Sequence, residues 1–385
     1  MRAGLTCITR AKIVLPDGVV DDASLLLEDG HIAAVEPERA PRGAEVVDLE
    51  GQWLMPGLVD LHCDALEKEI EPRPGVHFPL AFAIANADKR NACAGITTVY
   101  HALSFAHDEL GVRNVDMAAD AIRAVHAYRN SLVDNRVHAR YEITDPAGAP
   151  VLAALLDESA LELLSFMDHS PGQGQFKTLE SYRDYVVRTY NRTPEEAERM
   201  ALDKIVSREA ATERVNALAA QARRGGVCLA SHDDDSGQRV AGMKALGVSV
   251  SEFPVNLEAA TEARRLGLST VFGAPNILRG SSQSGNMRAL EAVRAGVADC
   301  LCADYAPATM LPAAMRLPSL TGMPLWEAIR MVTRAPALAA GLGDRGEIAP
   351  GLRADLIAVR DIQGTPQATH AWCAGRLTYR ARYPG

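Results

Sequence analysis

The chain has 385 residues, of which 48% are hydrophobic and 5% aromatic, and its formal net charge is −9. Length and composition favour an α/β enzyme, with one large domain or a large and a small one, over a disordered or fibrous protein. The acidic balance argues against nucleic-acid binding, which needs a basic face, but a small phosphorylated ligand needs only a few local cations.

The sequence predicts neither a signal peptide nor a membrane-spanning helix. The N-terminal segment has no apolar core of signal-peptide length, and no run approaches the roughly 20 apolar residues of a membrane span. The seven cysteines are scattered and include no Cys-x-x-Cys pair, which is typical of reduced thiols. We therefore expect a cytoplasmic protein with no membrane partner.

The two ends of the chain share one pattern. Residues 1–55 are predicted to form short strands and turns, because Asp17-Gly18 and Asp29-Gly30 separate apolar runs in the manner of β-hairpins. Residues 345–385 return to the same pattern. We expect both ends to meet in one small, discontinuous β-sandwich domain beside a catalytic domain over residues 56–344.

Eight short apolar runs lie between these ends, and helical patterns separate them. Each run is apolar where it starts and polar where it ends. They begin at Gly57, Gly95, Val137, Leu161, Gly226, Gly247, Leu268 and Asp299. This repeat predicts an α/β fold of the (β/α)8 TIM-barrel type, whose catalytic groups lie at the C-terminal ends of the strands.

One segment, near residues 176–224, is longer than the barrel repeat requires, since a barrel helix needs only about a dozen residues. Its pattern is charged and helical, and Thr193-Pro194 is a typical helix start. We expect a helical insertion on the active-site side of the fourth strand. Two interpretations stay open: a lid over the site, or a contact between subunits.

Metal-binding side chains gather at the ends of the predicted strands. His62 and Asp64 are two residues apart, so on a strand they point the same way. Imidazoles and carboxylates are ligands that Zn²⁺ and Mn²⁺ prefer, and this much negative charge suits two ions bridged by a carboxylate. The predicted metal ligands are His62, Asp64, Glu142, His169, His232 and Asp304.

Other residues near these positions have structural interpretations. Cys300 and Cys302 are expected to pack in the barrel interior, and Arg140 shares a face with Glu142 and would pair with it in the alternative interpretation. Asp233 is expected to face away if its neighbours face in. The remaining histidines are expected at the surface or in ordinary hydrogen bonds, with His101 and His107 as possible neighbours of the ligands and His31, His77, His126, His138 and His370 in the ordinary class.

Two motifs, LMPGLVDLH over residues 54–62 and GEIAPGLRADLIAV over residues 346–359, resemble the amidohydrolase superfamily of metal-dependent barrel hydrolases. SFMDHSPGQGQF over residues 165–176 and GAPNILRGSSQSGN over residues 273–286 resemble its branch in phosphonate metabolism. That resemblance implies hydrolysis of the 5-triphosphate of alpha-D-ribose 1-methylphosphonate 5-triphosphate to the 5-phosphate and pyrophosphate. It also implies His-x-Asp in place of His-x-His, and Glu142 as the bridging carboxylate. Ala65 and Gln283 depart from the pattern of that branch, near the expected substrate mouth.

The resemblance implies a mechanism in which two divalent ions, zinc or manganese, activate a water molecule and Asp304 accepts its proton. Phosphoryl transfer depends on charge neutralisation and positioning. The residues expected to bind the substrate are Arg73, Arg279, Lys177, Gln283 and Asn286. Hydrolysis of a cyclic amide or another small C–N substrate is the alternative, and a non-catalytic scaffold is a second one. A sugar phosphonate substrate and a homo-oligomer are the expected partners.

Overall fold

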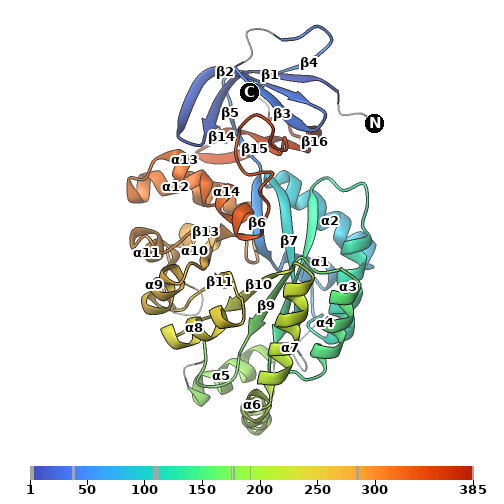
Figure 1. Ribbon diagram of the computed structural model, residues 1–385, viewed down its shortest axis with the longest axis vertical. Helices are drawn as coiled ribbons and strands as arrows, with labels where there is room; N and C mark the ends of the chain where they lie inside the picture. Colours follow the sequence, from blue (N-terminus) through green and yellow to red (C-terminus); the bar gives the residue numbers. More distant parts are fainter. Residues whose placement is uncertain are drawn as a thin grey trace.

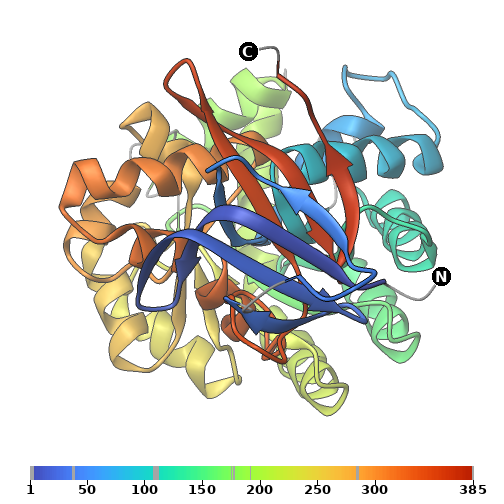
Figure 2. The same cartoon turned by 90° about the horizontal axis from the view of Figure 1, so that it is seen from above.

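The computed structural model describes residues 4–36, 40–106, 112–174, 176, 178–190, 192–282 and 286–383. It contains a β-sheet built from both ends of the chain, drawn at the top of Figure 1, and a barrel with surrounding helices below it. Blue N-terminal strands and red C-terminal strands lie side by side in both views (Figure 2). This arrangement confirms the predicted fold class.

The terminal sheet runs in the order β16-β15-β14-β5-β1-β2-β3, and β4 pairs with β1. Its strands are β1 (Thr6–Leu15), β2 (Gly18–Glu28), β3 (His31–Val35), β4 (Glu45–Asp48), β5 (Trp53–Pro56), β14 (Leu356–Ile362), β15 (Thr365–Cys373) and β16 (Arg376–Arg380). The two ends join where β5 pairs antiparallel with β14. Ile13, Leu54 and Trp372 are buried in the core of this sheet.

The predicted hairpins both occur. Asp29 and Gly30 connect β2 to β3 with φ of 46° and 85°, the left-handed conformation that a two-residue type I′ turn requires. Between β1 and β2 the turn residues are Pro16 and Asp17, because Leu15 pairs with Gly18. Turn chemistry in the sequence therefore located both hairpins to within one residue.

All eight predicted barrel strands are present, in sequential order and parallel. They are β6 (Leu58–Cys63), β7 (Ile96–Phe105), β8 (Asp134–Glu142), β9 (Leu163–Met167), β10 (Cys228–His232), β11 (Val250–Glu252), β12 (Ser269–Gly273) and β13 (Cys300–Cys302). The ring closes between its first and last strands. The Asp304 amide donates to the His62 carbonyl at 2.9 Å, and the Asp64 amide donates to the Asp304 carbonyl at 3.0 Å.

The barrel interior is filled by apolar side chains. Val59, Leu61, Cys300 and Cys302 belong to this buried cluster, so the two cysteines pack in the core as predicted. Strand β6 carries one extra residue between Asp60 and Cys63, where its partner strand advances by only two. Such a bulge changes which face the following side chains occupy. It follows that Leu61 fills the interior and His62 still lines the mouth of the barrel.

Helices surround the barrel (Figure 1). They are α1 (Ala65–Ile70), α2 (Leu80–Cys93), α3 (Val115–Ala127), α4 (Gly148–Asp157), α5 (Leu179–Tyr190), α6 (Pro194–Glu209), α7 (Ala211–Arg224), α8 (Gly237–Ala245), α9 (Leu257–Arg265), α10 (Ala274–Arg279), α11 (Ala289–Arg294), α12 (Met310–Thr321), α13 (Leu325–Arg330) and α14 (Arg334–Ala339), with a 3-10 turn at Pro307–Thr309. Among these described helices, none combines the length and apolarity that a membrane span requires.

The predicted insertion contains three helices, of which α7 is the ordinary barrel helix, because it packs on α4 and β10. The additional helices are α5 and α6, which pack on each other. Helix α6 starts at the predicted cap: Thr193 Oγ1 accepts from the Glu196 amide at 3.2 Å, and Glu196 Oε2 accepts from the Thr193 amide at 2.9 Å. The extra structure between β9 and β10 is therefore a helical hairpin.

A buried arginine ties the C-terminal segment to the barrel. Arg345 is 3% exposed, and its Nη1 lies 2.6 Å from Asp134 Oδ2 and 3.0 Å from Thr98 Oγ1. Arg345 also contacts the carboxylate of Asp344. The domain boundaries at residues 55 and 345 stay a prediction, and this arginine lies at the second of them.

Candidate metal centre

A cavity of about 260 Å³ opens at the C-terminal ends of the barrel strands. Five of the six predicted ligands line it: His62, Asp64, His169, His232 and Asp304. Asn286 and Arg279 line it as well, so two residues expected to bind substrate lie at the same cavity. Arg73 is exposed in a short turn with Val76 and is not among the lining residues. Lys177 and Gln283 lie outside the described residues.

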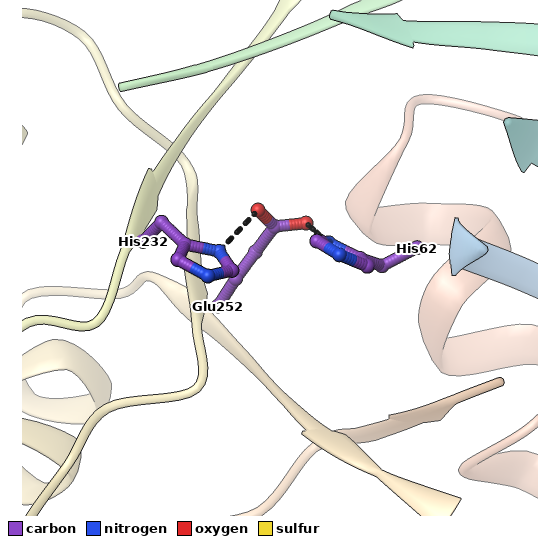
Figure 3. A group of neighbouring side chains, drawn as sticks. All are labelled: His62, His232 and Glu252. Atoms are coloured by element: carbon purple, nitrogen blue, oxygen red, sulfur yellow. Dashed lines mark hydrogen bonds and ion pairs between the residues drawn. The ribbon is translucent and has the colours of Figure 1, made fainter. Parts of the chain in front are cut away.

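The inner part of the centre is formed by His62, His232 and Glu252, shown in Figure 3. The Nδ1 of His62 donates to Glu252 Oε1 at 3.0 Å, and the Nδ1 of His232 donates to Glu252 Oε2 at 3.4 Å. These contacts assign the Nδ1–H tautomer to both rings, so each Nε2 carries a lone pair, and that of His232 accepts from Arg140 Nη2 at 3.3 Å. A carboxylate that orients ligand histidines in this way is a common support of metal sites.

The strands determine this arrangement. His232 and Glu252 pair directly as the last residues of neighbouring strands β10 and β11. The ring of Phe253 packs edge-on against His62 at 5.0 Å and against His232 at 5.2 Å between centroids. Burial lowers the pKa of both imidazoles well below the ordinary value, and the nearby Arg140 charge adds to this effect. Both rings are therefore neutral, which is the form that binds metal.

The outer part is formed by His169, His232 and Asp233, whose ligand atoms lie within 4.8 Å of one another. His232 is common to both parts. The Nε2 of His169 is buried and has no hydrogen-bond partner among the described residues. The expectation that Asp233 faces away was wrong, because this residue leaves the strand with a left-handed φ of 54° and turns its carboxylate to 3.7 Å from His169.

Glu142 lies behind His169 and belongs to neither group of possible ligands. Its Oε2 is 3.1 Å from His169 Nδ1 and 3.6 Å from Lys204 Nζ, so it orients the imidazole and meets the helical hairpin. Burial alone would lower the pKa of His169, but its contacts with Asp233 and Glu142 raise that pKa to about 9. Arg140 makes no ion pair with Glu142, contrary to the alternative interpretation.

Asp304 stands where the barrel ring closes. Its backbone is left-handed, with φ of 55°, and its side chain lines the cavity. Burial and the neighbouring carboxylate of Asp64 raise the pKa of Asp304 to about 7, although the charge of Arg140 opposes this rise. A carboxylate with such a pKa can accept a proton near neutral pH. Asp64 itself lies 3.5 Å from Arg113.

Sequence reasoning did not assign Asp233 and Arg140, which line the cavity, or Glu252, which lies buried behind its histidines. The signal for Glu252 was present, because it ends the sixth apolar run as His232 ends the fifth. His138 was assigned to ordinary hydrogen bonds, which is correct: its Nδ1 donates to the Leu61 carbonyl at 3.1 Å. Its Nε2 nevertheless lies 3.7 Å from Glu252, directly behind the inner histidines.

The donor set fits divalent metal ions. Imidazole nitrogens and carboxylate oxygens converge on one cavity, and the buried Nε2 of His169 there has no hydrogen-bond partner among the described residues. Helices α5 and α6 add Tyr182, Tyr185, Met200 and Lys204 to the wall of the cavity, so the hairpin borders the site.

The profile of the amidohydrolase family matches residues 53–378. The chain belongs to the amidohydrolase family. Among curated relatives, the alpha-D-ribose 1-methylphosphonate 5-triphosphate diphosphatase of Escherichia coli (strain K12) is 35% identical over 379 residues, which cover 97% of this chain and 100% of that protein. A dihydroorotase of Anaeromyxobacter dehalogenans (strain 2CP-C) is 31% identical over 102 residues, 23% of this amidohydrolase and 24% of the relative.

Solved structures share the fold of this amidohydrolase. The N-isopropylammelide isopropylaminohydrolase of Burkholderia multivorans ATCC 17616 superposes with a TM-score of 0.64 at 18% identity, covering 98% of each chain. The N-acetylglucosamine-6-phosphate deacetylase of Pasteurella multocida superposes with a TM-score of 0.61 at 14% identity, covering 97% of this chain and 99% of that one. At such identities the likeness shows the amidohydrolase fold alone.

Proposed function

We propose that this amidohydrolase is a metal-dependent diphosphatase that hydrolyses the 5-triphosphate of alpha-D-ribose 1-methylphosphonate 5-triphosphate to the 5-phosphate and pyrophosphate. The observation that carries the proposal is the 35% identity to the Escherichia coli enzyme of that name over 97% of this chain and the whole of that protein. A fold alone would not identify the substrate, since one fold hosts many reactions.

The proposed metal ligands are His62, His169, His232 and Asp233, with Glu252 and Glu142 holding the rings. Asp64 and Asp304, which also line the cavity, stay ligands predicted from the sequence. Two divalent ions, zinc or manganese, suit this nitrogen and oxygen set. When bound, such ions supply hydroxide from water near neutral pH. Asp304 would serve as the proton acceptor of the site, because its pKa is raised to about 7 and its side chain lines the cavity.

Charge in the cavity supports a phosphorylated substrate. Arg113, Arg140, Lys204 and Arg279 line it from four different segments. Cations placed around a triphosphate stabilise the charge that spreads over its oxygens during phosphoryl transfer. Asn286, with Gln283 in the same loop, is proposed to contact phosphate oxygens. Arg73 and Lys177 stay predictions from the sequence.

The deciding experiment is ³¹P NMR of the metal-loaded protein with alpha-D-ribose 1-methylphosphonate 5-triphosphate. A growing pyrophosphate signal beside an intact phosphonate resonance is expected. An unchanged spectrum, with metal verified in the sample, would contradict the proposal and favour the C–N hydrolase alternative. Ala65 and Gln283, which depart from the expected pattern, would then be the first positions to test for altered substrate choice.

The proposal also covers the compartment, the substrate class and the oligomeric state. The protein acts in the cytoplasm, its substrate is a small sugar phosphonate, and it assembles as a homo-oligomer. The seven free cysteines support the first of these, because reduced thiols are typical of that compartment. Size-exclusion chromatography with light scattering tests the third.

A further inference from the structure

Arg140 is an unusual residue of the cavity, because it is buried and charged but has no carboxylate partner among the residues that the structure describes. It lies on β8, is 6% exposed, and lines the cavity. Its Nη1 donates to Ser104 Oγ at 3.4 Å and its Nη2 donates to His232 Nε2 at 3.3 Å. The Nε has no hydrogen-bond partner in the part of the chain that the structure describes. Both contacts it does make are long and to neutral groups.

Arg345, the other arginine that is buried in the described chain, and the half-buried Arg239 are both paired with carboxylates. Arg239 lies 3.2 Å from Asp234, and Arg345 lies 2.6 Å from Asp134. A guanidinium stays charged at any pH at which the protein folds, and a buried charge without a counter-ion is costly. Such a residue is retained where an anion completes the site, so the missing partner of Arg140 points to a ligand.

We infer that Arg140 binds a phosphate oxygen of the substrate beside His232 and thereby selects anionic over neutral substrates. This inference rests on the proposed function. The Nε2 lone pair of His232 serves one partner at a time, so a metal ion on that nitrogen leaves the Nη2 of Arg140 for the anion. The planar fork of the guanidinium matches the geometry of phosphate oxygens. A neutral cyclic amide offers no such group.

The test measures binding of inorganic phosphate to metal-loaded protein by isothermal titration calorimetry, with metal content determined in every sample. Arg140→Gln removes the charge and the fork, and Arg140→Lys keeps the charge alone. Arg136→Gln is the matched control. Arg136 lies on the same strand, but it does not line the cavity, and its Nε is 3.1 Å from Asp134 Oδ2. We expect Arg140→Gln to raise the Kd for phosphate about tenfold or more, since hydrogen bonds between charged groups are strong.

Arg140→Lys should give an intermediate Kd, and Arg136→Gln should match the wild type. Unchanged phosphate binding by Arg140→Gln would overturn the inference. A loss of metal that parallels the loss of phosphate binding would also overturn it, and so would a wild type that binds no phosphate.

The proposed function and this inference can fail separately. Wild-type protein that binds phosphate through Arg140 but leaves the ribose triphosphate intact refutes the proposed function alone. Turnover by the wild type, with normal phosphate binding by Arg140→Gln, refutes this inference alone.

Discussion

The carboxylate of Glu252 accepts a hydrogen bond from Nδ1 of His62 at 3.0 Å, across a sequence separation of 190 residues. Its second oxygen lies 3.4 Å from His232, so one buried side chain fixes two rings from the first and fifth strands of the barrel. Removing that carboxylate should disturb both rings together. The inner half of the metal centre thus depends on a residue of the sixth strand.

Glu252→Gln should lower metal affinity about 10–100-fold, because loss of a group that orients ligand histidines has effects of that size. An amide cannot accept from both rings, and it lacks the charge that makes them better ligands. Competition with a chelator measures the affinity. Glu162→Gln is the control, since Glu162 accepts from the Val137 amide at the opposite end of the barrel. Equal metal affinity in the two variants would exclude the role given to Glu252.

Metal content should test the two parts of the centre, one ligand at a time. Because Asp233 belongs to the outer group only, Asp233→Asn should leave about one ion per chain. His232→Asn removes an imidazole whose Nε2 can bind one ion, so this variant should also lose about one ion and should reduce turnover by a factor of thousands. Elemental analysis of the purified variants gives the numbers. Full metal content in either variant would contradict the ligand role of the residue that it changes.

The helical hairpin should depend on Lys204. Its Nζ lies 3.6 Å from Glu142, which in turn contacts His169, so the hairpin and the metal centre meet at this carboxylate. Lys204→Met should increase hydrogen exchange in α5 and α6 and raise KM for the substrate. Lys244→Met, in the last turn of α8, is the control. Unchanged exchange and kinetics in Lys204→Met would favour the alternative that the hairpin is only a subunit contact.

Arg345→Leu should destabilise the fold by about 1–3 kcal/mol, because it removes a buried partner from the half-buried carboxylate of Asp134, which keeps two other arginines. Urea unfolding followed by circular dichroism gives the free energy. Arg376→Leu changes an exposed residue of the terminal sheet and should alter the stability little. A small effect of the first variant would mean that Arg136 and Arg353, 3.1 Å and 3.6 Å from the same carboxylate, hold it without Arg345.

Most of the fold could be predicted from the sequence, since apolar runs with polar ends identify barrel strands whatever their detailed contacts. The hairpin at Asp29-Gly30 could be predicted equally well, because few residue types adopt the left-handed backbone conformation of its turn. The predicted range of the helical insertion was too broad, because α7 belongs to the barrel. Only the packing of α7 distinguishes it from α5 and α6.

The site was less predictable, because side-chain direction at a strand end depends on backbone geometry that the alternation rule ignores. Asp233 turns inward through a left-handed residue, and the bulge in β6 changes the alternation before His62. Arg140 could not be assigned for another reason. Its pairing with Glu142 was reasonable from spacing, but Lys204, from a distant helix, contacts that carboxylate instead.

The closure of the barrel at Asp304 has a consequence for protein synthesis. The first strand leaves the ribosome long before the last one. The Asp60 carboxylate accepts its hydrogen bond from the amide of Ala303, which is synthesised 243 residues later. Until then His62 lies on a strand whose outer edge is unpaired, and β5 lacks its neighbour β14. Contacts this distant in sequence slow folding. A nascent chain that stops short of residue 304 therefore has metal-seeking side chains but no ring to hold them.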